Sequence, residues 1–169
     1  MFIVRAKKKE KKYLDTIMLL SKIRTELIND SIAKDICEEN NVDDKFLAGV
    51  CIKFDDLEVS AKTINSEIIL NKKLMEKSFD VIMRYVIHEL VHAIQHCMKQ
   101  DKKDKKDNQE NHYLDNKDEV DAFQKQVLYQ SENNGEKSAE KYVDELLDYH
   151  EISGENAEKK KKELMEEVV

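Results

Sequence analysis

Apolar residues recur at helical spacing in two long stretches of the chain. Between residues 13 and 39, leucine, isoleucine and methionine side chains return every three or four positions until the polar cluster EENNVDD. The same period returns over residues 78–98, where Ser78 suits the N-cap and Asp80 is favourably placed in the first turn. The pattern therefore predicts a long N-terminal helix and a second long helix in the middle of the chain.

Between these helices the pattern changes to short runs that are rich in β-branched residues. The runs are AGVCIKF (48–54), LEVSAKTI (57–64) and EIIL (67–70), and aspartate, asparagine and serine residues separate them. Their connections look too short for parallel crossovers, which usually need a dozen or more residues. We therefore expect a small, three-stranded antiparallel sheet.

The second half of the chain predicts further helices. Residues 101–111 hold no apolar side chain, so we expect an exposed loop there. Helical spacing returns over residues 117–131 and 138–150. The resulting fold class is α+β, with one domain over residues 1–150 and a charged C-terminal tail over residues 151–169, which we expect to be a frayed helix beyond Gly154.

The composition excludes some classes of binding partner and indicates the cellular compartment. The net charge of the 169 residues is −7, and the chain has only three arginines, so nucleic acid is a poor partner. No apolar stretch is long enough to span a membrane, and neither an anchor nor a signal peptide is expected. The three cysteines are far apart and form no CxxC, which argues against a disulfide framework and favours the reducing cytoplasm.

The candidate chemistry lies in the second long helix, which contains the motif HExxH as His88-Glu89-Leu90-Val91-His92. At 100° per residue, the second histidine is about 40° around the helix from the first and one turn along it. Two imidazole nitrogens can then converge on one ion, as in zinc sites. Glu89 projects beside that ion without having to bind it. On the same helical wheel, the histidines face away from the apolar stripe, with Arg84 and Tyr85.

A hydrolytic zinc centre needs a third protein ligand and one open position for water. His96 is unsuitable, because eight residues of straight helix place it roughly 12 Å along the axis from His88. A carboxylate on a neighbouring helix is a better candidate, and Glu119 is favoured because the small Ala122 one turn later allows close packing of the two helices. The alternatives that remain open are Asp115, Asp118, Asp121 and His112. Asp121 could instead accept a hydrogen bond from a ligand imidazole.

These residues resemble a known family. The segments HELVHAIQH (88–96) and DEVDAF (118–123), preceded by the strand pair at 60–71, resemble gluzincin-type zinc metallopeptidases, and more closely small phage-encoded ones. The resemblance covers about half of the chain, from roughly residue 48 to residue 130. It implies a minimal zincin-like domain, a protein or peptide substrate, and a phage or prophage origin.

The resemblance also implies roles for individual residues. His88, His92 and Glu119 correspond to the zinc ligands, and Glu89 to the general base that activates a zinc-bound water for hydrolysis of peptide bonds. The chain departs from the thermolysin-like pattern at Phe123, where an aspartate would orient a ligand histidine, so the partner of the imidazoles is undetermined.

Two aspects of catalysis stay open at this level. An oxyanion donor could come from an aromatic or imidazole side chain, and the candidates are Tyr113, His112, Tyr142 and His150. An extended substrate could pair with an exposed strand such as SAKTI (60–64).

Three other interpretations compete with an enzyme. The histidines could form an exposed face without metal, or hold a structural zinc ion in a non-catalytic interaction protein. A di-iron carboxylate bundle would need a second Glu-x-x-His motif, and the sequence has none. The sequence predicts neither the substrate nor the oligomeric state.

Overall fold

The structure, a computed structural model, describes residues 2–100 and 113–168. This part of the chain forms seven α-helices, three short 3-10 helices and a three-stranded sheet, which confirms an α+β fold that is mostly helical. The helices are α1 (Phe2–Asn29), α2 (Ser31–Glu39), α3 (Lys45–Gly49), α4 (Phe79–Gln100), α5 (Lys117–Asn134), α6 (Glu136–Tyr149) and α7 (Glu155–Leu164). The strands and 3-10 helices are β1 (Cys51–Asp55), β2 (Ala61–Ile64), β3 (Glu67–Asn71), η1 (Lys72–Glu76), η2 (Tyr113–Asp115) and η3 (Glu166–Val168).

The sheet is mixed, with the strand order β1-β3-β2. Strands β2 and β3 form the expected antiparallel hairpin, whose turn places Asn65 and Ser66 at positive φ. Strand β3 pairs in parallel with β1, in register Ile52 to Ile68, so the expectation of a wholly antiparallel sheet was wrong. The chain from β1 to β3 includes the whole of β2, and this detour to the far side of β3 gives a parallel pair without a crossover helix.

The first predicted helix is two helices. Asp30 has extended backbone geometry, with ψ of 132°, and its side chain accepts a hydrogen bond of 2.8 Å from the backbone N–H of Ala33. An aspartate that caps a new helix in this way ends the preceding one. The first strand likewise begins later than predicted, because residues 45–49 form α3.

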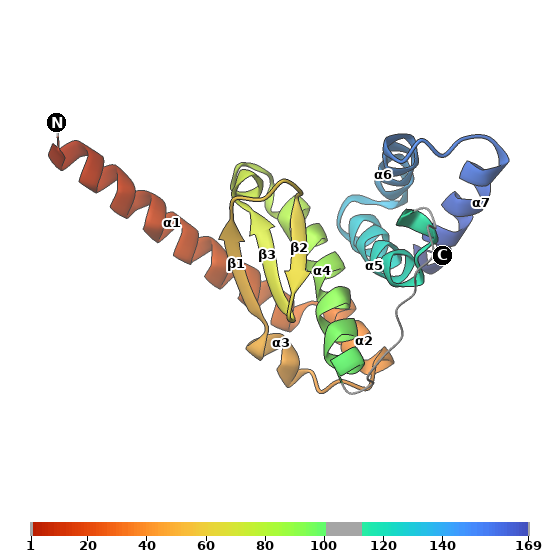
Figure 1. The fold of residues 1–169 in the computed structure, drawn as a ribbon, viewed down its shortest axis with the longest axis horizontal. Coiled ribbons are helices and arrows are strands. Elements are labelled where there is room, and N and C mark those ends of the chain that lie inside the picture. The colour runs from red at the N-terminus through yellow and green to blue at the C-terminus, as the bar shows by residue number, and fades with distance from the viewer. Residues whose placement is uncertain (1, 101–112, 169) are drawn as a thin grey trace.

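Helix α4 lies between the sheet and α5 (Figure 1), and it begins within one residue of the predicted position. Strands β2 and β3 pack on one side of it and α5 on the other. Its buried side chains therefore surround the axis, and His88 and Glu89 are only 6% and 5% exposed. The sequence predicted a separate histidine face opposite an apolar stripe, but α5 buries that face as well.

Two hydrophobic clusters stabilise the described part of the chain. The first joins the sheet to α1, α2 and α4, and the second joins η2 to α5, α6 and α7. Leu164 of α7 is completely buried in the second cluster. The tail is thus helical, as expected, but packed rather than frayed, while the domain boundary at residue 150 stays a prediction.

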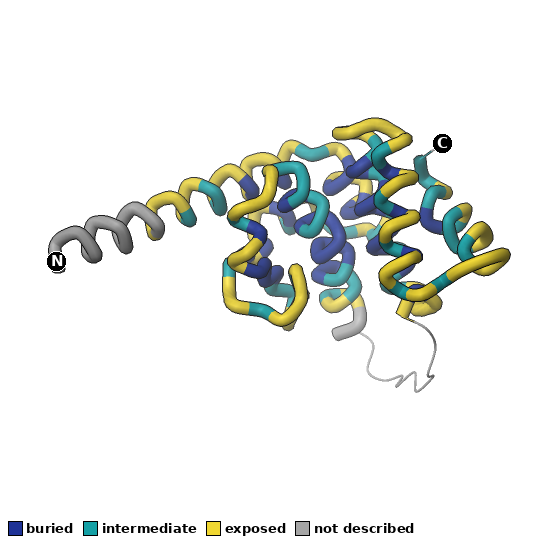
Figure 2. The backbone as a smooth tube through the Cα atoms, turned by 90° about the horizontal axis from the view of Figure 1, so that it is seen from above, coloured by how far each residue is buried: buried dark blue, intermediate teal, exposed yellow. Residues whose placement is uncertain are grey.

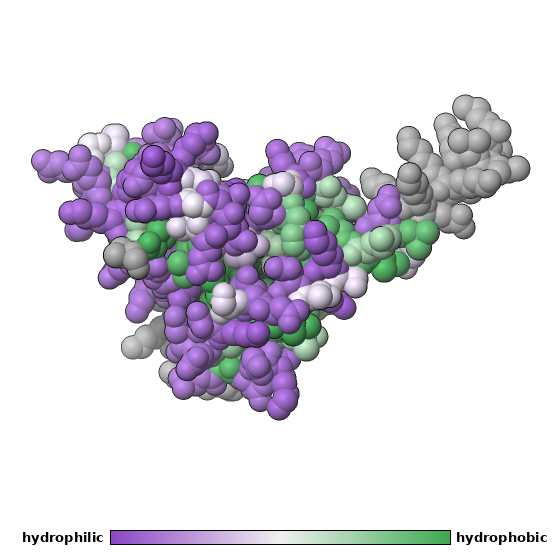
Figure 3. Space-filling view, turned by 180° about the vertical axis from the view of Figure 1, so that it is seen from behind, coloured by the Kyte–Doolittle hydropathy of each residue, from purple (hydrophilic) through white to green (hydrophobic). Residues whose placement is uncertain are grey.

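Helix α1 projects from the body of the molecule (Figures 1 and 2). Ile23 and Leu27 near its C-terminal end are completely buried. Farther out, apolar side chains gather on its surface (Figure 3). They are Tyr13, Leu14, Ile17 and Met18, which are 45–71% exposed. Within the described residues, no helix has the length and hydropathy of a membrane span. The loop predicted at 101–111 lies outside the described residues.

Candidate metal centre

Helices α4 and α5 bring His88, His92 and Glu119 together. The Nε2 atoms of the two histidines are 3.2 Å apart. One carboxylate oxygen of Glu119, Oε2, lies 3.6 Å from Nε2 of His88 and 3.4 Å from Nε2 of His92. Among the described residues, these three form the one group of histidine, cysteine or carboxylate side chains whose ligand atoms converge closely enough to hold a metal ion.

The position of Glu119 follows from the start of α5. Asn116 caps this helix by accepting a hydrogen bond of 3.0 Å from the backbone N–H of Asp118, so Glu119 falls in the first turn. Ala122, one turn later on α5, is completely buried and belongs to the first hydrophobic cluster. Its small side chain lets α5 approach α4, as the sequence analysis argued.

The electrostatics of Glu119 favour the ionised carboxylate. Burial alone would raise the pKa of this carboxyl, but polar contacts from His88, His92 and the Tyr113 hydroxyl outweigh burial and hold the pKa far below its ordinary value. Oε2 is nevertheless buried without a hydrogen bond of ordinary geometry from any described residue. A buried, charged oxygen that lacks a donor is a natural ligand for a cation.

Glu89 lies beside this cluster and is held by strand β2. The hydroxyl of Thr63 is 2.8 Å from Oε2 of Glu89 and 3.0 Å from the Glu89 carbonyl oxygen, and it can donate to either. Burial raises the pKa of the Glu89 carboxyl, while His88, Thr63 and His92 partly offset that rise. Thr63 could not be recognised from the sequence, because a threonine within a strand carries no sign of such a contact.

A glutamine on α4 orients the second histidine. Nδ1 of His92 lies 3.0 Å from Oε1 of Gln95, and the amide of Gln95 donates a hydrogen bond of 3.4 Å to the carbonyl oxygen of Asp118. Nδ1 of His88, by contrast, is buried without a hydrogen-bond partner among the described residues. The contact to Gln95 puts the proton of a neutral His92 on Nδ1 and leaves Nε2 free for a metal. Asp121, which could have had this role, does not make the contact.

The alternative ligands are elsewhere or engaged in other contacts. The carboxylate of Asp115 pairs with Lys160 at 3.2 Å. Asp121 lines a different hollow together with Lys125, and His96 is exposed, as expected of a residue on the outer surface of the helix. Asp118 contributes its backbone oxygen to the contact with Gln95. His112 lies outside the described residues.

An open cleft of about 580 Å³ leads to His88 and Glu89. One wall comes from residues 58–61, which precede and begin strand β2, and the opposite wall from α6. Of the proposed oxyanion donors, Tyr113, Tyr142 and His150 all line the cleft. Tyr113 stacks on the His150 ring, with centroids 5.3 Å apart.

Phe123 replaces a polar partner for His88 with an apolar contact. Its ring meets the His88 imidazole edge to face, with centroids 4.6 Å apart. Since the side chain of Phe123 is 7% exposed, it shields this imidazole from water. The departure from the thermolysin-like pattern at this position therefore removes a hydrogen bond and adds packing.

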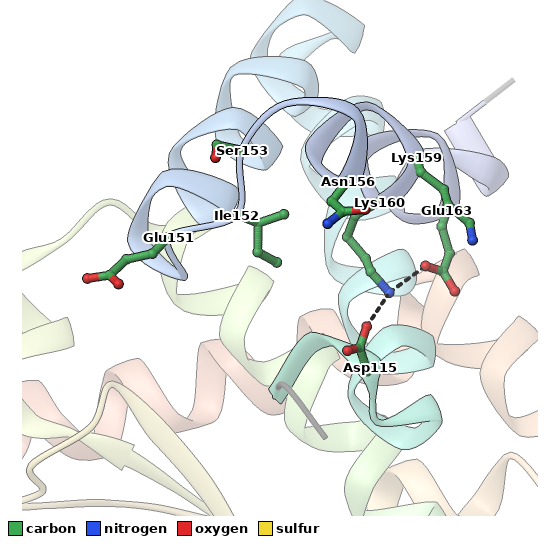
Figure 4. A pocket seen from close by; sticks show the side chains of 8 residues that line it. All are labelled: Asp115, Glu151, Ile152, Ser153, Asn156, Lys159, Lys160 and Glu163. Atoms are coloured by element: carbon green, nitrogen blue, oxygen red, sulfur yellow. Dashed lines mark ion pairs between the residues drawn. The ribbon is translucent and has the colours of Figure 1, made fainter. Parts of the chain in front are cut away.

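A larger hollow, of about 770 Å³, is lined by η2, by α7 and by the loop that joins α6 to α7, and neither His88 nor His92 lines it. Lys160 is at its centre and pairs with Asp115 and Glu163 (Figure 4). Lys160 also donates a hydrogen bond of 2.8 Å to the carbonyl oxygen of Leu114. The ammonium group of Lys160 therefore already has its hydrogen-bond partners. We interpret these contacts as a structural link between α7 and the turn that precedes α5.

Comparisons with protein-family models, with curated proteins and with solved structures found no match for this chain. The function therefore has to be inferred from the chemistry of the site.

Proposed function

We propose that the protein is a zinc-dependent metallopeptidase with a gluzincin-type centre of His88, His92 and Glu119. The observation that supports this most strongly is the spacing of the ligand atoms. Their separations are 3.2, 3.4 and 3.6 Å. A tetrahedral zinc ion with bonds of about 2.0–2.1 Å keeps its ligand atoms roughly 3.4 Å apart. Two imidazole nitrogens and a carboxylate oxygen that converge to this degree fit a cation.

The accessible side of the centre favours catalysis over a structural role. A structural zinc ion usually has four protein ligands, whereas a catalytic ion keeps one position open. Within the described residues, no fourth ligand group joins the three. The cleft reaches the same point, since both His88 and Glu89 line it.

Glu89 has the position and the acidity expected of a general base. When bound, zinc would polarise the scissile carbonyl and lower the pKa of a water molecule. The carboxylate of Glu89 accepts a proton from water and passes it to the leaving amine. Burial raises the pKa of Glu89 above its ordinary value, which makes it a better base than an exposed glutamate, and Thr63 contacts its carboxylate at 2.8 Å.

Metal analysis combined with a peptide-library cleavage assay tests this proposal. We expect the wild-type protein to bind one zinc ion and cleave peptides. His88→Ala should lose both properties, whereas Glu89→Gln should keep zinc and lose cleavage. Glu119→Gln should bind zinc at least about tenfold more weakly, because an amide is a poorer ligand than a carboxylate. His96→Ala is the matched control on the same helix and should behave as wild type.

Two results would contradict the proposal in different ways. Full zinc content in His88→Ala would show that zinc does not bind at the proposed site. Stoichiometric zinc without cleavage of any peptide would leave a non-catalytic zinc-binding protein. The proposal also includes a reducing cytoplasmic compartment, in keeping with three free cysteines, and a phage or prophage origin.

A further inference from the structure

The more buried part of the cleft beside the metal centre is aromatic. Tyr85 from α4, Phe123 from α5 and Tyr142 from α6 line it, so three different helices contribute one ring each. Phe123 is nearly inaccessible, and Tyr85 and Tyr142 are partly buried. The guanidinium of Arg84 lies 4.1 Å from the centroid of the Tyr142 ring and holds that ring by a cation–π contact. Rigid aromatic walls of this kind bind a large apolar side chain.

A polar side chain without a partner also lines this part of the cleft. Gln126 is 1% exposed, and its amide nitrogen makes no hydrogen bond within the described part of the chain. It follows Glu119 by seven residues, which places both on the same face of α5. A buried N–H group that lacks an acceptor destabilises the folded protein, so an acceptor supplied by a ligand is the natural partner. The peptide carbonyl is the acceptor that every peptide substrate carries.

The charge of the lining limits the residues beside that side chain. Glu58 on one wall and Glu145 on the other are exposed carboxylates, and Glu89 is a third at the metal centre. The described residues that line the cleft include no lysine or arginine. The nearest cation to Glu145 is Lys141 at 3.4 Å, in an exposed pair that contributes little. A ligand with acidic side chains would therefore be repelled.

We propose that this cleft selects peptides with a large apolar or aromatic residue flanked by neutral or basic residues. The apolar side chain lies among Tyr85, Phe123 and Tyr142, and an adjacent peptide carbonyl accepts a hydrogen bond from Gln126. Glu58 and Glu145 attract basic flanking residues. This inference rests on the proposed function, because the cleft defines a substrate only if His88 and Glu89 belong to a peptidase centre.

Binding to an inactive form of the full chain tests the proposal without turnover. The protein is zinc-loaded Glu89→Gln, and the probes are three fluorescein-labelled heptapeptides measured by anisotropy. The first has a central phenylalanine with lysine at both ends, the second has alanine at the centre, and the third has glutamate at both ends. We expect the first to bind about tenfold more tightly than the second, which lacks the aromatic side chain, and about fivefold more tightly than the third.

Substitutions assign these preferences to residues. Gln126→Leu should weaken binding of the phenylalanine peptide about tenfold, with zinc content and melting temperature maintained. Gln126→Met keeps the length of the side chain but cannot donate, so it should weaken binding as much. Glu145→Lys should shift the preference toward the glutamate peptide. Glu140→Lys makes the same charge change on the same helix, outside the lining of the cleft, and is the matched control for it.

Equal affinity for the phenylalanine and alanine peptides would overturn the inference, as would unchanged binding in Gln126→Leu. Failure of the proposed function has a different signature, since the wild-type protein would then bind no zinc or cleave no peptide. Cleavage of all library peptides at similar rates would support the peptidase activity and refute the proposed selectivity. If the protein binds these peptides selectively but cleaves none of them, the selectivity of the cleft would be supported and the peptidase activity would be refuted.

Discussion

The two hydrophobic clusters contribute to the candidate centre in different ways. The first cluster contains the sheet and α4, and it fixes His88 and His92 on a helix that is enclosed on both sides. The second contains η2 and α5 to α7, and it positions the segment that carries Glu119. Helix α5 contributes to both, since Ala122 packs in the first cluster and Phe123 in the second. Metal binding should therefore depend on the junction between the clusters more than on the stability of either.

The largest difference between the clusters should appear in the free energy of unfolding. Leu90 and Leu164 are both completely buried, the first in α4 and the second at the end of α7. We expect Leu90→Ala to lower the free energy of unfolding by roughly 3–5 kcal/mol, because the enclosed site cannot collapse into the cavity. Leu164→Ala should lower it by about 2 kcal/mol, because the partly exposed Met165 and Val168 beside it can relax. Urea unfolding measures both, and equal losses would contradict this contrast.

The junction itself can be disturbed by enlarging one residue. Ala122→Leu inserts three carbon atoms where α5 packs closely on the first cluster, and it should destabilise the protein by about 1–3 kcal/mol. Zinc affinity should fall more than tenfold, because Glu119 is displaced from the histidines. Ala139→Leu, completely buried in the second cluster, is the matched control. It should destabilise the chain and leave zinc affinity within about threefold of wild type. A similar loss of zinc affinity in both variants would refute a special role of the junction.

Gln95 of α4 contacts His92 on the same helix and donates a hydrogen bond to α5. Gln95→Leu removes the acceptor for His92 and the donor to the Asp118 carbonyl, so zinc affinity should fall about tenfold with little change in melting temperature. Competition with a chromogenic chelator measures the affinity. His96→Leu, one residue along and exposed, should have no effect. Unaltered zinc binding in Gln95→Leu would mean that His92 needs no such support.

Lys125 gives the smallest predicted effect, which depends on pH. This lysine of α5 pairs with Glu39 of α2 at 2.7 Å and with Glu167 of η3 at 2.9 Å. Burial lowers its pKa, but the two hydrogen-bonded carboxylates outweigh burial and raise the pKa above the ordinary value of 10.5.

The native state therefore binds this proton more tightly than the unfolded chain does. The resulting stability is fully present below pH 10.5 and is lost as the pH rises through the raised pKa. Lys125→Met should lack this alkaline loss, which we expect to be about 1 kcal/mol. Urea midpoints of both proteins between pH 8 and about 11.5 compare the two curves, and parallel curves would contradict the prediction.

The sequence predicted the central helix and the arrangement of His88 and His92 on it, because both depend on local spacing. The period of apolar residues placed the start of α4 to within one residue, and HExxH specifies its own geometry once it lies on a helix. Glu119 was inferred from its small neighbour Ala122, and the structure brings it to both histidines. Its role as a zinc ligand stays a prediction.

Other features depended on tertiary contacts that no local pattern encodes. The parallel pairing of β1 with β3 arises because β2 turns back along the far side of β3, and alternation along each strand is the same for either pairing. Gln95 and Gln126 have the polar character of surface residues, and only the position of α5 shows their contacts with the site. The break at Asp30 could have been found, since aspartate is a favoured helix N-cap.

The link between Lys160 and the Leu114 carbonyl also affects the order of events during synthesis. These residues are separated by 46 positions, and the turn at Leu114 leads directly into the helix that carries Glu119. When Glu119 has just been added to the nascent chain, α7, the helix that secures this turn, has not yet been synthesised. We therefore expect the proposed centre to gain its full affinity for metal only after translation has passed Lys160.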